Sequence, residues 1–106
     1  MRDLTPVELR KHLDNCETEP LVLDVREQWE YDICHLPGSI LVPMGKITTV
    51  AHTFATDRET VVICHHGIRS RSVCEYLEQV GLTQVINLAG GIAAWSQDVD
   101  PTLATY

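Results

Sequence analysis

Residues 61–70 read Val61-Val62-Ile63-Cys64-His65-His66-Gly67-Ile68-Arg69-Ser70, and this stretch decides the fold of the chain. Its first four residues form an uninterrupted apolar run of strand length, rich in β-branched side chains that favour strands. A short loop with one glycine follows, and from about Ser70 the apolar residues recur at helical spacing, at Val73, Leu77 and Val80. A fully apolar strand followed by a helix is the repeating unit of parallel sheets.

The same alternation of strands and helices extends to both sides of this stretch. Further strands are predicted at Leu21–Val25, Ile40–Val42 and Val85–Leu88, and helices are predicted after Thr5-Pro6, at Glu27–Tyr31, along Ile47–Phe54 and after Gly90-Gly91. We therefore expect an α/β fold, with a mainly parallel sheet covered by helices on both faces. Residues 1–106 are expected to form one domain, and residues 100–106 a loose tail.

Composition and charge exclude several classes of function. The chain has 106 residues, and its 15 acidic residues against 8 lysines and arginines give a net charge of −7. Nucleic acid would be repelled, and no apolar run is long enough to cross a membrane. No apolar signal region precedes the first helix, so we expect a cytoplasmic protein. None of the four cysteines forms a C-x-x-C pair, so we expect free thiols, no metal and no cofactor.

Cys64 is the candidate nucleophile, because parallel sheets place ligands at the carboxyl ends of their strands. The backbone N–H groups around Gly67 and the positive end of the following helix can both face an anion there. Arg69, Arg71, His65 and His66 add positive character close to the thiol, which favours the reactive thiolate. The alternative is that Cys64 only packs at a strand end, or that Cys64, His65 and His66 bind a metal. We disfavour the metal because adjacent residues rarely chelate one ion.

The other cysteines lack such surroundings. Cys74 lies beside Val73 and Leu77 inside a predicted helix and is interpreted as core packing. Cys16 and Cys34 lie near turns without obvious partners and are interpreted as incidental thiols.

Three motifs in this order resemble the rhodanese, or thiosulfate sulfurtransferase, family over nearly the whole chain. They are Leu23-Asp24-Val25-Arg26 with Glu30-Tyr31 and His35–Ile40, the loop Cys64–Arg69, and Asn87–Trp95. The resemblance implies a five-stranded sheet and a persulfide carried on Cys64. It also implies that the substrate is bound by the loop residues His65, His66, Gly67, Ile68, Arg69 and Ser70. This chain has His65 where many family members have arginine.

The resemblance implies a sulfur donor such as thiosulfate or a persulfide, and a thiol, cyanide or sulfur-accepting protein as acceptor. Asp24 and Arg26 are expected to form a supporting ion pair at a strand end. Two alternatives remain: a cysteine phosphatase or arsenate reductase, and a non-catalytic binding module. Phosphatases of this kind place five residues between cysteine and arginine, whereas four separate Cys64 from Arg69, and this shorter ring favours a single sulfur atom over a phosphate.

Overall fold

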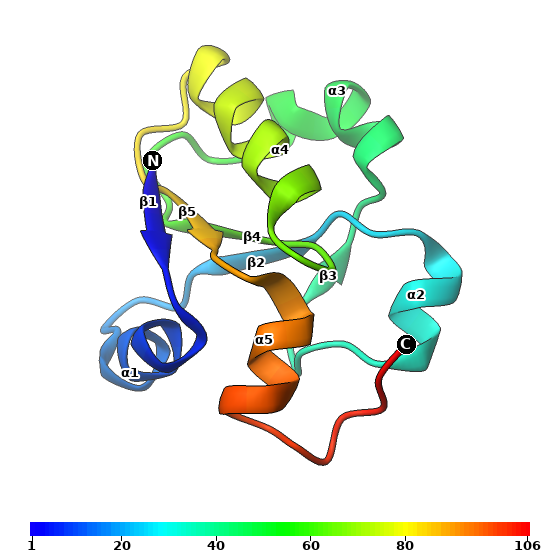
Figure 1. Ribbon diagram of the computed structural model, residues 1–106. Coiled ribbons are helices and arrows are strands. Elements are labelled where there is room, and N and C mark those ends of the chain that lie inside the picture. The colour runs from blue at the N-terminus through cyan, green and yellow to red at the C-terminus, as the bar shows by residue number, and fades with distance from the viewer.

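Five strands form one sheet in the computed structural model, which describes residues 1–106 (Figure 1). All four neighbouring pairs are parallel, so the expected α/β fold with a five-stranded parallel sheet is confirmed. In spatial order the strands are β1 (Arg2–Leu4), β5 (Val85–Leu88), β4 (Thr60–Ile63), β2 (Leu21–Asp24) and β3 (Ile40–Leu41).

Helices cover both faces of the sheet, because side chains along each strand alternate between two apolar cores. Val61 and Ile63 of β4 belong to the core under α1 (Pro6–Asn15) and α5 (Gly91–Asp98). Val62 and Cys64 belong to the opposite core, with side chains from α3 and α4. Helix α3 spans Ile47–Val50 and α4 spans Ile68–Gln79. Figure 1 shows α1 and α5 on one side of the sheet and α3 and α4 on the other. The remaining elements are α2 (Gln28–Ile33) and two 3-10 turns at Met44–Lys46 and Ala51–Thr53.

The first helix begins as its sequence predicts. The Thr5 hydroxyl accepts a hydrogen bond from the Glu8 N–H at 3.3 Å, and the Glu8 carboxylate accepts one from the Thr5 N–H at 2.9 Å. Pro6 occupies the first helical position, where its missing N–H costs no hydrogen bond.

Several boundaries differ from the prediction by one or two residues, and the helix predicted along Ile47–Phe54 is divided into α3 and a 3-10 turn. Two further differences concern the start of the chain and the start of α4. The sequence predicts no strand before the first helix, yet Arg2–Leu4 pairs as edge strand β1 with Ile86–Leu88. Three residues are too short a run for periodicity to reveal. Helix α4 begins at Ile68 rather than near Ser70, because Gly67 adopts a left-handed conformation (φ +94°) and ends the loop there. None of the helices combines the length and apolarity needed to span a membrane.

Candidate active site

Cys64 directly follows β4 at the carboxyl edge of the sheet, where the chain turns toward α4 (Figure 1). The residue is only 1% exposed. Its sulfur accepts a hydrogen bond from the Gly67 N–H at 3.0 Å and donates one to the Ser70 hydroxyl oxygen at 3.3 Å. One backbone amide of the loop thus already points at the sulfur, where negative charge develops on ionisation.

A polar chain behind Cys64 orients the Ser70 hydroxyl. This hydroxyl donates to the Asn87 side-chain carbonyl at 2.5 Å, and the Asn87 amide donates to Asp3 at 3.0 Å. Asn87 comes from β5, which lies next to β4, and Asp3 comes from the edge strand β1 beyond it, so both strands support the residue that faces the sulfur. With its proton committed to Asn87, the Ser70 oxygen accepts the proton of the neutral thiol.

The turn before α5 fixes the shape of the loop from the other side. The Ile92 N–H donates to the Cys64 carbonyl at 2.9 Å, and the Ala93 N–H donates to the His65 carbonyl at 3.1 Å. Gly91 has φ +62°, and a side chain there would collide with the carbonyl of His65. A side-chain carbon at Gly67 would lie 3.1 Å from the backbone of β5 and the turn. Glycine therefore lets the two segments pack backbone against backbone.

The chain also matches a known protein family. The family described as Rhodanese-like domain matches residues 5–98. The chain belongs to this family. The resemblance inferred from the three sequence motifs is thereby confirmed, and the family's chemistry is sulfur transfer.

Relatives of this rhodanese-like domain differ in length. It is 31% identical over 101 residues to "Putative sulfurtransferase YtwF" of Bacillus subtilis, covering 95% of this chain and 96% of the relative. It is 33% identical over 105 residues to "Probable adenylyltransferase/sulfurtransferase MoeZ" of Mycobacterium tuberculosis, but spans only 26% of that protein. The crystal structure of a rhodanese-like domain protein from Staphylococcus aureus matches with a TM-score of 0.84 at 30% identity, covering 100% of this chain and 99% of that one.

Asp24 and Arg26 form a fully buried ion pair at the end of β2. Arg26 Nη2 lies 2.7 Å from Asp24 Oδ2, and Arg26 Nε donates to Asp24 Oδ1 at 2.9 Å. Arg26 Nη2 also donates to the Cys34 carbonyl at 2.6 Å, which ties the end of β2 to the residue that closes α2. Removing either charge would leave the other buried without its partner.

Both arginines of the loop region have carboxylate partners that the sequence analysis does not anticipate. Arg69 binds Glu30 of α2 through two hydrogen bonds of 2.7 and 2.8 Å, and this pairing lowers the pKa of Glu30 to about 2. Arg71 pairs with Asp3 at 2.7 Å. The positive character expected near Cys64 is therefore partly balanced. Glu30 belongs to the first motif, but its pattern does not reveal a partner 39 residues away.

Tyr106 reaches the loop from the far end of the chain. Its hydroxyl accepts from Arg26 Nη1 at 2.9 Å and donates to Glu30 Oε2 at 2.7 Å, and its ring stacks on His65 with centroids 4.0 Å apart. The segment expected to be a loose tail thus ends in a residue with specific contacts. Trp29 adds an edge contact to the same ring at 5.6 Å.

The remaining loop residues have different environments. His65 is half-buried, and burial together with the nearby His66 lowers its pKa. His66 and Ile68 are exposed, and 77% of Ile68 faces solvent. Cys74 is fully buried in the core, and burial raises the pKa of its thiol to about 12. Its thiol therefore stays protonated at neutral pH.

Proposed function

We propose that this domain transfers a sulfane sulfur through a persulfide on Cys64. Thiosulfate or a persulfide donates the sulfur, and a thiol, cyanide or a sulfur-accepting protein receives it. The observation that carries the proposal is the Gly67 N–H, which points at the Cys64 sulfur 3.0 Å away. An N–H group aimed at the sulfur suits a persulfide, because the terminal sulfur of a persulfide is anionic.

In the first half of the cycle, the Cys64 thiolate attacks the outer sulfur of thiosulfate. A new sulfur–sulfur bond forms on Cys64, the sulfur–sulfur bond of thiosulfate breaks, and its electron pair leaves with sulfite. Arg69 keeps N–H groups beyond the two that bind Glu30, and these can hold the departing anion. The Ser70 hydroxyl and the Gly67 N–H, which both contact the Cys64 sulfur, then lie beside the persulfide.

In the second half, the acceptor thiolate or cyanide attacks the terminal sulfur and Cys64 leaves as a thiolate, so electrons balance without a redox cofactor. The cycle is ping-pong, because sulfite departs before the acceptor reacts. We place it in the cytoplasm, where acceptor thiols stay reduced, and the four free cysteines fit such a compartment.

Intact-protein mass spectrometry after thiosulfate treatment tests the proposal. The wild type should gain the mass of one sulfur atom, and cyanide should remove it as thiocyanate. Cys64→Ser should gain nothing and lose transfer, because serine has no thiol to carry the sulfur. Cys74→Ser is the matched control and should still gain one sulfur.

Two results would overturn the proposal: sulfur addition that persists in Cys64→Ser, or aryl-phosphate hydrolysis by the wild type with no sulfur addition. The second result would move the phosphatase alternative ahead.

A further inference from the structure

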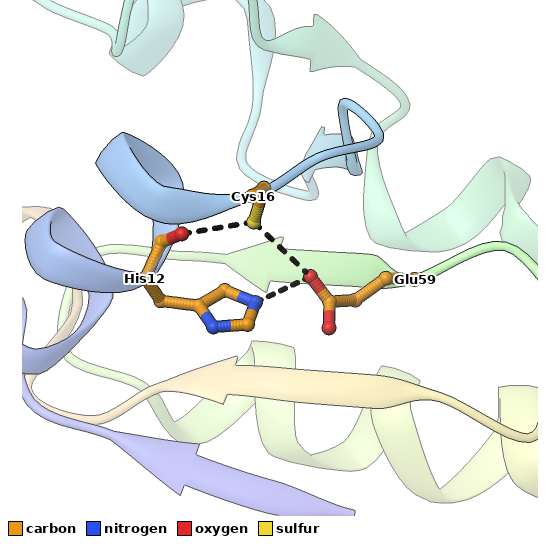
Figure 2. A group of neighbouring side chains, drawn as sticks. All are labelled: His12, Cys16 and Glu59. Atoms are coloured by element: carbon orange, nitrogen blue, oxygen red, sulfur yellow. Dashed lines mark hydrogen bonds and ion pairs between the residues drawn. The ribbon is translucent and has the colours of Figure 1, made fainter.

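A second group of reactive side chains lies at the amino ends of the strands, whereas Cys64 lies at their carboxyl ends. His12 and Cys16 are four residues apart, on and just after α1, and Glu59 immediately precedes β4 (Figure 2). The His12 ring nitrogen Nε2 and the Cys16 sulfur both contact the same Glu59 oxygen. The i, i+4 spacing places both side chains on one face of the helix end.

The sequence analysis does not account for this group. The sequence analysis interprets Cys16 as an incidental thiol without partners, and the structure contradicts that by giving it two. The order of the groups also differs from a catalytic triad, in which the histidine lies between the thiol and the acid. Here the carboxylate lies between the thiol and the imidazole (Figure 2).

The spacing of the three groups suits a metal ion. Their ligand atoms all lie within 4.8 Å of one another. Tetrahedral zinc with bonds of about 2.0–2.3 Å holds its ligand atoms about 3.3–3.8 Å apart. Small side-chain rotations therefore bring imidazole nitrogen, thiolate sulfur and carboxylate oxygen into one coordination sphere.

The surroundings also favour a cation. The three residues line a surface cavity of about 430 Å³, and Glu17, Glu19 and Asp57 line it as well. Arg58 is the one lysine or arginine among the lining residues. About a quarter of the His12 and Glu59 side chains is exposed, so an ion can enter and water can reach a fourth coordination position.

We propose that His12, Cys16 and Glu59 bind a divalent transition-metal ion of the zinc class, with a fourth position open to water in the cavity. Imidazole, thiolate and carboxylate are together the ligand set of zinc sites. On binding, the Cys16 thiol releases its proton to solvent. The proton with which His12 Nε2 contacts the Glu59 carboxylate is also displaced, and the neutral imidazole coordinates through Nε2 with its remaining proton on Nδ1.

The bound ion would join the end of α1 to the start of β4. Because Glu59 precedes β4 and Cys64 follows it, the ion lies at the other end of this strand from the sulfur-transfer loop. The metal site is therefore independent of the proposed sulfur chemistry.

Metal binding to the full chain, first stripped with a chelator, tests this inference. Isothermal titration with Zn²⁺ should give one ion per chain, and Co²⁺ should produce a thiolate-to-metal charge-transfer band in the near ultraviolet. Cys16→Ser should abolish the band, and Cys16→Ser and His12→Gln should each weaken Zn²⁺ binding more than about 100-fold. Loss of groups that merely support a metal ligand already costs about 10–100-fold. Circular dichroism checks that each variant is folded.

Three matched controls separate this site from other thiols, histidines and acids. Cys64→Ser, His52→Gln and Glu75→Gln, which lie outside the cavity, should keep both the affinity and the cobalt band. Cys16→Ser should also keep its wild-type rate of sulfur transfer. The inference fails if the cobalt band survives in Cys16→Ser, if Cys64→Ser removes it, or if the wild type binds no Zn²⁺.

Discussion

At the residue scale, the most informative position is His65, which follows Cys64. It stacks against Tyr106 and is half-buried. Burial and the neighbouring His66 lower its pKa below the ordinary value of 6.5. A charged residue here would attract an anionic donor, but a histidine with a lowered pKa is mostly neutral at pH 7.

We predict that the affinity for thiosulfate depends on the charge of His65. Because the charged form appears only as pH falls below about 6.5, the affinity should strengthen in that acidic range. His65→Arg carries its charge at every pH, so it should bind thiosulfate more tightly at pH 7 and flatten the pH profile. Measuring KM for thiosulfate at pH values from about 5 to 8, which span the ordinary histidine pKa of about 6.5, checks this prediction.

His52→Arg adds the same charge at an exposed position on a 3-10 turn and serves as the control. An unchanged KM profile in His65→Arg would show that His65 does not sense the donor.

A second residue-scale prediction concerns Glu30. Its carboxyl is 4% exposed, and the Arg69 guanidinium lowers its pKa from 4.5 to about 2. A depressed folded-state pKa stabilises the fold above the unfolded value, and this contribution is lost as pH falls from about 4.5 to 2. Glu30→Gln should therefore lower the free energy of unfolding at pH 7 by about 2 kcal/mol, less than the full shift implies because Arg69 is a third exposed.

Urea denaturation at pH values from about 3 to 7 would measure the difference in free energy of unfolding between the wild type and Glu30→Gln. This difference should shrink as the pH falls. Glu27→Gln, at the exposed start of the same helix, is the control. A difference that does not vary with pH would exclude the ion pair as its cause.

At the scale of elements, the length of the loop between β4 and α4 determines where its N–H groups lie relative to the Cys64 sulfur. Gly67 ends the loop in a left-handed conformation, and its N–H points at the Cys64 sulfur. The α5 turn holds the other side through the carbonyls of Cys64 and His65. The start of α4 and the turn before α5 therefore both hold the loop, and its diameter cannot change without loss of these contacts.

We predict that one glycine inserted between Gly67 and Ile68 will impair sulfur transfer. The inserted residue moves the loop N–H groups away from the persulfide position, so the rate should fall more than about tenfold, or about 1.4 kcal/mol of transition-state stabilisation. The larger ring should also bind phosphate or arsenate at the start of α4. Thiocyanate formation with and without these anions measures both effects.

A glycine inserted between Gly45 and Lys46, in a 3-10 turn outside the loop, is the control. If the loop insertion leaves sulfur transfer untouched, ring size does not select the substrate.

At the scale of the whole molecule, Tyr106 contacts residues of the proposed active site that lie far from it in the chain. Tyr106 reaches back 80 residues to Arg26 and 76 residues to Glu30. Through these contacts, the buried Arg26–Asp24 pair, the Glu30–Arg69 pair and His65 all touch one aromatic side chain.

We predict that Tyr106→Ala will raise the pKa of His65 toward its ordinary value. Burial is the main reason that this pKa is low, and the Tyr106 ring covers one face of the imidazole. Tyr106→Phe keeps the ring and should leave the pKa near its wild-type value, but should cost about 1 kcal/mol of stability by removing the hydroxyl partner of Arg26. NMR titration of the His65 ring and urea denaturation measure the two effects.

Tyr31→Phe removes a hydroxyl bonded to the Ser39 carbonyl and serves as the control. A His65 titration identical in wild type and Tyr106→Ala would contradict the covering role.

The amino-acid sequence determined the fold class, because that information is local. Uninterrupted apolar runs define buried strands, and the Thr5–Glu8 capping box defines the start of α1. It also placed Cys64 at the carboxyl edge, since strand and loop are adjacent in the chain. Strand β1 was missed because three edge residues carry too little periodicity. Its pairing with β5 depends on partners more than 80 residues away.

The distribution of charge around the sulfur depends on contacts between elements that are distant in the chain. The sequence shows two arginines near Cys64, but Glu30 and Asp3, which balance them, come from other elements. It likewise could not bring Tyr106 to His65 or Glu59 to His12 and Cys16. Side-chain partners across the molecule are set by packing, and packing leaves no periodic signal in the chain.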